Sequence, residues 1–92
     1  MHNALDSPVS HSIDSHGVLG PGGGGGKVTP TPPGATSVFQ FQAMRPGVFI
    51  YHCATPMIPY HLAHGMYGLM VVEPPGGWPK VDKEFYVMEG DI

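Results

Sequence analysis

The stretch GVFIYHC, residues 47–53, is rich in β-branched and aromatic side chains and ends in a histidine and a cysteine. This composition is typical of a buried strand. The sequence RPG at 45–47 predicts a turn just before it, and residues 37–43 (SVFQFQA) alternate apolar and polar side chains as a half-buried strand does. Together these stretches predict a strand, a turn and a second strand that places His52 and Cys53 at its end.

The rest of the chain predicts more short strands and no long helix. Breakers dominate residues 17–36, where five glycines stand in a row at 22–26, so we expect a loop there. Further strands are expected at 8–13, 66–73 and 83–88, with a loop or short helix at 54–65 and a turn at 74–79. Short strands separated by turns indicate an all-β sandwich or barrel. The strands are too few to close one, so we expect an incomplete domain of a longer protein.

The composition excludes several classes of function. Charged residues make up only 12% of the 92 residues, the net charge is -3, and no basic patch suits a nucleic acid. No apolar run approaches the roughly 20 residues of a membrane span, and residues 1–16 are too polar for a signal peptide. Cys53 is the single cysteine among six histidines and six methionines, which favours a metal or redox site over a disulfide scaffold.

Cys53, His61 and Met66 form the pattern C-x7-H-x4-M at the end of a strand and across the next loop. A thiolate, an imidazole and a thioether, completed by a second imidazole, are the ligands of a blue-copper electron-transfer site. His11 is the candidate for the second imidazole. Each residue alone is more often part of a core or a surface, but their joint occurrence favours copper.

Side-chain parity predicts a second set of residues. Adjacent residues on a strand point to opposite faces, so His52 faces outward if Cys53 faces inward. His11 and His16 are five residues apart, so in an extended chain their side chains also point to opposite faces, and Asp14 shares a face with His16. Two outward imidazoles beside a carboxylate suggest part of a second metal site with a proton donor, whose third ligand comes from another domain or subunit.

At these residues the sequence resembles the copper-containing nitrite reductases. The resemblance rests on HSIDSH at 11–16, YHCA at 51–54, HLAHGMYG at 61–68 and MVVEPPGGWPKVDKEFYVMEGD at 70–91. It implies a cupredoxin-like Greek-key β-sandwich or barrel, of which residues 1–92 are an incomplete first (plastocyanin-like) domain. It also implies two such domains per subunit and a homotrimer, located in the periplasm or at the cell envelope.

The resemblance also implies roles for the site residues. The type 1 copper would be held by His11, Cys53, His61 and Met66. The type 2 copper would be held by His16 and His52 with a third histidine from a neighbouring subunit, and Asp14 would be the catalytic aspartate. The reaction would be reduction of nitrite to nitric oxide, as in denitrification, with electrons from a small cupredoxin or a cytochrome c.

The sequence departs from the family in several places. Ser15 replaces a usual aromatic residue, the loop between Cys53 and His61 is one residue shorter than in some members, and the glycine run is long. No ligand role is expected for His2, Met57 or His64. Because the third type 2 ligand is missing from this sequence, we expect no useful nitrite reductase activity from these 92 residues alone.

Three other functions compete with this interpretation. A small blue-copper electron carrier needs only the inward set and leaves the outward one without a purpose. A laccase-like oxidase needs His-x-His pairs and a His-Cys-His strand, whereas Ala54 follows Cys53 here. An all-β interaction module leaves the pattern of His, Cys and Met unexplained.

Overall fold

The computed structural model describes residues 1–20 and 29–91, so the glycine run at 22–26 lies outside the described residues. The described part is all-β in class, as predicted, with two small antiparallel sheets and one short helix. None of its helices is long and apolar enough to cross a membrane.

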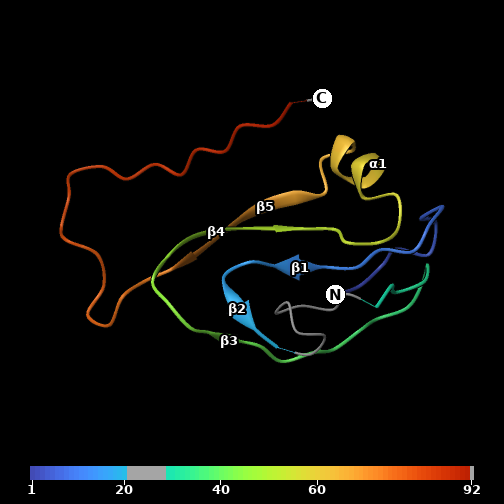
Figure 1. The fold of residues 1–92 in the computed structure, drawn as a ribbon, viewed down its shortest axis with the longest axis horizontal. Helices are drawn as coiled ribbons and strands as arrows, with labels where there is room; N and C mark the ends of the chain where they lie inside the picture. Colours follow the sequence, from blue (N-terminus) through green and yellow to red (C-terminus); the bar gives the residue numbers. More distant parts are fainter. Residues whose placement is uncertain (21–28, 92) are drawn as a thin grey trace.

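The larger sheet has the order β1-β4-β5, with β4 in the centre (Figure 1). Its strands are β1 (Asp14–Ser15), β4 (Gly47–His52) and β5 (Tyr67–Val72). The antiparallel register sets His52 of β4 opposite Asp14 of β1 and opposite Tyr67 of β5. The strands predicted at 47–53 and 66–73 are therefore confirmed to within a residue, and the central strand leads directly into Cys53.

The smaller sheet pairs β2 (Val18–Leu19) with β3 (Gln42–Ala43). The strand predicted at 37–43 is thus confirmed only in its last two residues. The segment 17–36, expected to be a loop, contains β2 close to its start. Val18 of β2 is buried.

Two predicted strands are wrong. Within 8–13 only His11 pairs, through a single antiparallel bridge to Thr31. Residues 83–88 form no strand, and the chain beyond β5 runs on without regular structure (Figure 1). A strand needs a neighbour to satisfy its N–H and C=O groups, and no described segment forms a ladder with 83–88. Apolar side chains there stay in solvent, as Phe85 does with 79% of its surface exposed.

The helix α1 (Ile58–Ala63) confirms the loop or short helix expected at 54–65. Met57 precedes it in a left-handed conformation with φ 70°, and a proline lies in its first turn, where a missing N–H is tolerated. Gly65, at φ 80°, ends it and donates its N–H to the Leu62 carbonyl at 2.9 Å. The one buried residue of this helix is His61, so the helix serves to hold that imidazole inside.

Burial in the described residues centres on polar groups. Val18 and Cys53 are the buried hydrophobic residues, whereas the buried polar ones are Asn3, Ser12, Ser15, Thr31, Thr55 and His61. The strong burial predicted for 47–53 is wrong for one face of β4, where Val48 is 56% and Ile50 is 37% exposed. Cys53 and His61 are therefore among the most enclosed of the described residues.

Candidate metal centres

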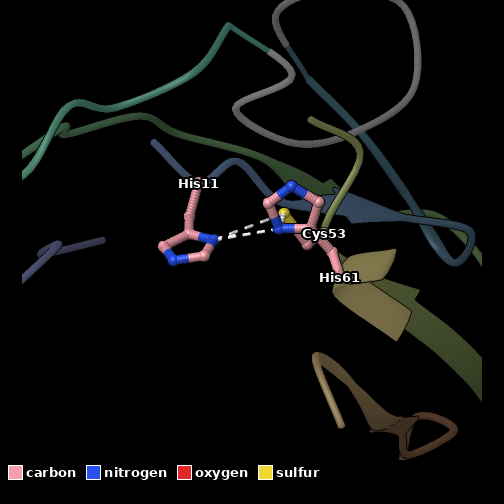
Figure 2. Close-up of side chains that lie close together, drawn as sticks. All are labelled: His11, Cys53 and His61. Carbon is pink, nitrogen blue, oxygen red and sulfur yellow. Dashed lines mark hydrogen bonds between the residues drawn. The ribbon is translucent and has the colours of Figure 1, made fainter. Parts of the chain in front are cut away.

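The first group of possible ligands is His11, Cys53 and His61, which Figure 2 shows converging from three segments. The Nδ1 atoms of the two histidines are 3.2 Å apart. The Cys53 Sγ lies 3.5 Å from the His61 Nδ1 and 3.9 Å from the His11 Nδ1. The two rings are nearly perpendicular, at 89°. One sulfur and two nitrogen atoms thus point at a common centre.

Backbone hydrogen bonds fix the segments that carry this group. His11 exchanges both of its backbone groups with Thr31, at 3.1 Å from its N–H and 2.6 Å to its carbonyl. The side chain of Asn3 donates to the carbonyls of Val9 and Thr31, at 3.0 and 2.9 Å. Asn3 is itself buried, so its side chain links the segment before His11 to Thr31 from inside the chain. Together with the backbone pairing of His11 and Thr31, this link holds the imidazole in place.

Met66 lies next to this group through its backbone. Its carbonyl accepts from the Cys53 N–H at 2.9 Å, and its N–H donates to the His61 carbonyl at 3.2 Å. A pocket of about 330 Å³ is lined by both Met66 and Cys53, together with Ser12 and His52. The loop therefore returns to the cysteine just before β5 begins, with Met66 between the ends of the two longest strands.

The electrostatics favour the metal-binding forms of this group. Cys53 is a free thiol that is 3% exposed. Burial raises the pKa of this thiol, but the hydrogen bonds from Ser12 and Thr55 together lower it by more, so the net result is a lowered pKa. Burial, and then the nearby His61, lower the pKa of His11. Thiolate and neutral imidazole are the forms that bind a metal.

The second group is Asp14, His16 and His52. The Nε2 atoms of the two histidines are 3.1 Å apart, and the Asp14 Oδ2 lies 3.9 Å from each. Strand pairing explains the arrangement, because β1 sets Asp14 opposite His52 and the His16 N–H donates to the Ile50 carbonyl at 3.0 Å. This group is more open: the side chains of His16 and His52 are 52% and 16% exposed.

One hydrogen bond orients the second group, and one of its oxygen atoms has no partner. The His52 Nδ1 lies 2.9 Å from the Cys53 carbonyl, an acceptor, so Nδ1 carries the proton and Nε2 keeps its lone pair. The Asp14 Oδ1 is buried, and it has no hydrogen-bond partner among the described residues. A buried carboxylate oxygen without a partner is costly, which fits a site where a further group binds.

Both donor sets suit copper. A thiolate with two imidazoles serves the softer reduced and the harder oxidised ion alike, and imidazoles with a carboxylate suit the oxidised ion. The first set lies inside the chain. The second offers two imidazoles on an open face, so it leaves positions for another ligand and for a substrate.

The structure brings six of the seven candidate residues into two groups and places the seventh, Met66, in backbone contact with the first. His2 and His64 lie outside both: the imidazole of His2 bonds Thr36, and that of His64 bonds the Tyr60 carbonyl. Sequence reasoning missed the hydroxyl residues around the first group, Ser7, Ser12 and Thr55. Their one signal in the sequence is that they lie within four residues of a candidate ligand.

Comparison with known proteins defines the class. The family model for multicopper oxidases matches residues 25–76, more than half of the chain. The chain therefore belongs to the multicopper oxidase family.

Within that family it is similar to proteins named copper-containing nitrite reductases, as its motifs indicated. The relative from Neisseria meningitidis serogroup A is 53% identical over 90 residues, which cover 98% of this chain and 23% of the relative. Those from Alcaligenes faecalis and Rhizobium meliloti are 40% and 42% identical over 98 residues, covering 98% of this chain and 26% of each relative. The chain thus spans about a quarter of the length of these relatives.

Proposed function

We propose that this chain is part of a copper-containing nitrite reductase that reduces nitrite to nitric oxide. The observation that carries the proposal is the pair of ligand groups on adjacent residues, with Cys53 in one and His52 in the other. Neither a simple electron carrier nor a binding module needs the second group. The similarity to named nitrite reductases over 98% of the chain supports the same choice.

His11, Cys53 and His61 would hold the type 1 copper, with Met66 as the weak axial ligand. The rigid backbone around them matters because electron transfer is fastest when a site changes little between oxidation states. His11 is tied to Thr31, and Cys53 is tied to Met66. Cys53 is 3% exposed, so its sulfur is shielded from water.

His16 and His52 would hold the type 2 copper, together with a third histidine from a neighbouring subunit. Copper in the two sites supplies one-electron transfer and Lewis-acid binding of the nitrite oxygens. The bond from His52 to Cys53 gives a short covalent path between them. The hydrogen bond from the His52 Nδ1 to the Cys53 carbonyl fixes the imidazole along that path.

Asp14 would hold and move the proton. Nitrite takes up one electron and two protons to give nitric oxide and water, so one oxygen of nitrite has to be protonated before it leaves. The Asp14 Oδ1 has no partner in the described residues, whereas Oδ2 faces both imidazoles. Oδ2 is on the side of these imidazoles, so it would hydrogen-bond nitrite and pass a proton to it as a positioned general acid.

The partners follow from the same proposal. The intact enzyme would be a homotrimer, as the resemblance to the copper-containing nitrite reductases implies, and a neighbouring subunit would supply the missing ligand of the second group. A small cupredoxin or a cytochrome c would supply the electrons, and the reaction would serve denitrification in the periplasm or at the cell envelope. The competing function is a small blue-copper electron carrier, for which the pairing of His16 with His52 at 3.1 Å would have no use.

A hybrid enzyme tests the proposal. In it, the 90 matched residues of the meningococcal relative are replaced by those of this chain. We expect two coppers per subunit and nitrite-dependent formation of nitric oxide, at rates on the order of 1–10³ s⁻¹. The control is the same hybrid with Cys53→Ala. A hybrid that folds and binds both coppers but forms no nitric oxide would contradict the proposal.

A further inference from the structure

The imidazole of His11 has a partner at each of its two ring nitrogens. Nδ1 faces the first group, 3.2 Å from the His61 Nδ1 and 3.9 Å from the Cys53 Sγ. Nε2 points away from these two residues (Figure 2) and lies 3.2 Å from the Ser7 hydroxyl oxygen. A metal bound at Nδ1 would thus leave Nε2 with Ser7 as its partner.

The hydrogen bonds of Ser7 decide which nitrogen of His11 carries the proton. The Ser7 hydroxyl donates to the Val9 carbonyl at 2.9 Å, and a carbonyl oxygen can only accept. Because a serine has a single hydroxyl proton, the Ser7 oxygen can only accept from His11. In the neutral imidazole, Nε2 then carries the proton and Nδ1 keeps its lone pair. That lone pair faces Cys53 and His61, where a metal ion would bind.

The surrounding chain holds this hydroxyl in place. Ser7 precedes Pro8, and a residue before proline is restricted to extended conformations. The Ser7 N–H donates to the Ala4 carbonyl at 3.1 Å. The Val9 carbonyl, which accepts from Ser7, also accepts from the buried Asn3 side chain at 3.0 Å. These constraints present the Ser7 oxygen to the imidazole.

An acceptor at the remote N–H makes a metal-bound imidazole more basic and fixes the orientation of its ring. A more basic nitrogen ligand favours copper(II), the harder ion, over copper(I). The contact with Ser7 should therefore lower the reduction potential of the site. The electron itself comes from the donor protein or from a chemical mediator, and no covalent bond of Ser7 changes.

We propose that Ser7 is a positioning residue that fixes the tautomer and the orientation of the His11 imidazole and thereby favours copper(II) at the first group. This inference rests on the proposed function, since it requires copper at that group. It assigns a task to a side chain that belongs to neither ligand group.

The test compares Ser7→Val with Ser7→Thr in the hybrid enzyme. The two new side chains have nearly the same shape, but only threonine keeps the hydroxyl. Ser7→Val should weaken copper(II) binding relative to copper(I) binding about tenfold, which raises the one-electron potential by ~59 mV. Ser7→Thr should keep the potential of the unmodified hybrid. A redox titration followed through the thiolate-to-copper band measures the potential, and competition with a chelator measures the copper(II) affinity.

Thr36→Val is the matched control. The Thr36 hydroxyl lies 2.9 Å from the His2 Nδ1, so this variant also removes a contact between a hydroxyl and an imidazole, but at a histidine outside both ligand groups. It should leave the potential and the band unchanged. Ser7→Ala removes the hydroxyl without adding bulk. It should raise the potential as Ser7→Val does, and it carries the test if Ser7→Val does not fold.

Three results would overturn the inference. An unchanged potential in the variants without the hydroxyl would show that Ser7 does not act on the copper. An equal rise in Ser7→Thr or in Thr36→Val would show that the hydroxyl at position 7 is not the cause. In both cases the thiolate band remains and the proposed function stands. A missing band in the unmodified hybrid would contradict copper at the first group, and with it both proposals.

Discussion

The two ligand groups occupy adjacent residues of one strand end but differ in how far the chain encloses them. In the first, Cys53 and His61 are 3% and 5% exposed. In the second, the His16 side chain is 52% exposed and the Asp14 side chain 25%. An enclosed set of soft and borderline donors suits electron transfer, whereas an open set has room for another ligand and for a substrate. One strand end thus carries two different sets of possible metal ligands because its side chains alternate.

The largest effect should come from Cys53→Ala in the hybrid enzyme. It removes the thiolate of the first group, so the intense thiolate-to-copper band should vanish and the copper content should fall from two per subunit to one. Visible absorption and electron paramagnetic resonance measure both. The signal of the second copper should persist, and its loss would show that the two groups do not bind metal independently.

The corresponding change in the second group is His52→Ala. It removes one of the two imidazoles of the open group but leaves the enclosed ligands in place, so the thiolate band should remain while the second copper is lost. Nitrite reduction should stop. Copper analysis combined with the absorption spectrum checks this, and a hybrid that keeps both coppers would count against the role of His52.

A smaller effect should follow from Asp14→Asn. The amide keeps the size of the side chain but cannot deliver a proton, so turnover should fall by about 10²–10⁴-fold. Both copper signals should stay. Steady-state nitrite reduction measures the loss, and full activity in this variant would remove Asp14 from the proton-transfer role.

The smallest effect should come from Val48→Thr on the outer face of β4. Val48 is 56% exposed and distant in register from both groups, since it pairs with Val71. The free energy of unfolding should change by no more than about 0.5 kcal/mol, and both copper spectra should be unchanged. Denaturant unfolding of the hybrid enzyme is the measurement, and a spectral change would mean that the outer face does affect the sites.

The sequence predicted more of the candidate site than of the fold. Strand alternation is a local rule, so the opposite directions of His52 and Cys53 followed from their adjacency. The contacts of Ser12 with Thr55 join positions 43 residues apart, and no local pattern encodes such a meeting. The strand predicted at 83–88 failed for a related reason: an apolar and aromatic stretch shows that a segment can pair, but pairing also needs a neighbouring strand.

The central claim is that the two groups form one electron path to nitrite, and a single optical experiment on the hybrid tests it most directly. The thiolate band is first bleached by anaerobic reduction, and nitrite is then added. The account predicts that the band returns as nitric oxide forms, and that it stays bleached in the His52→Ala hybrid. A band that remains bleached in the unmodified hybrid, with both coppers bound, would contradict the claim.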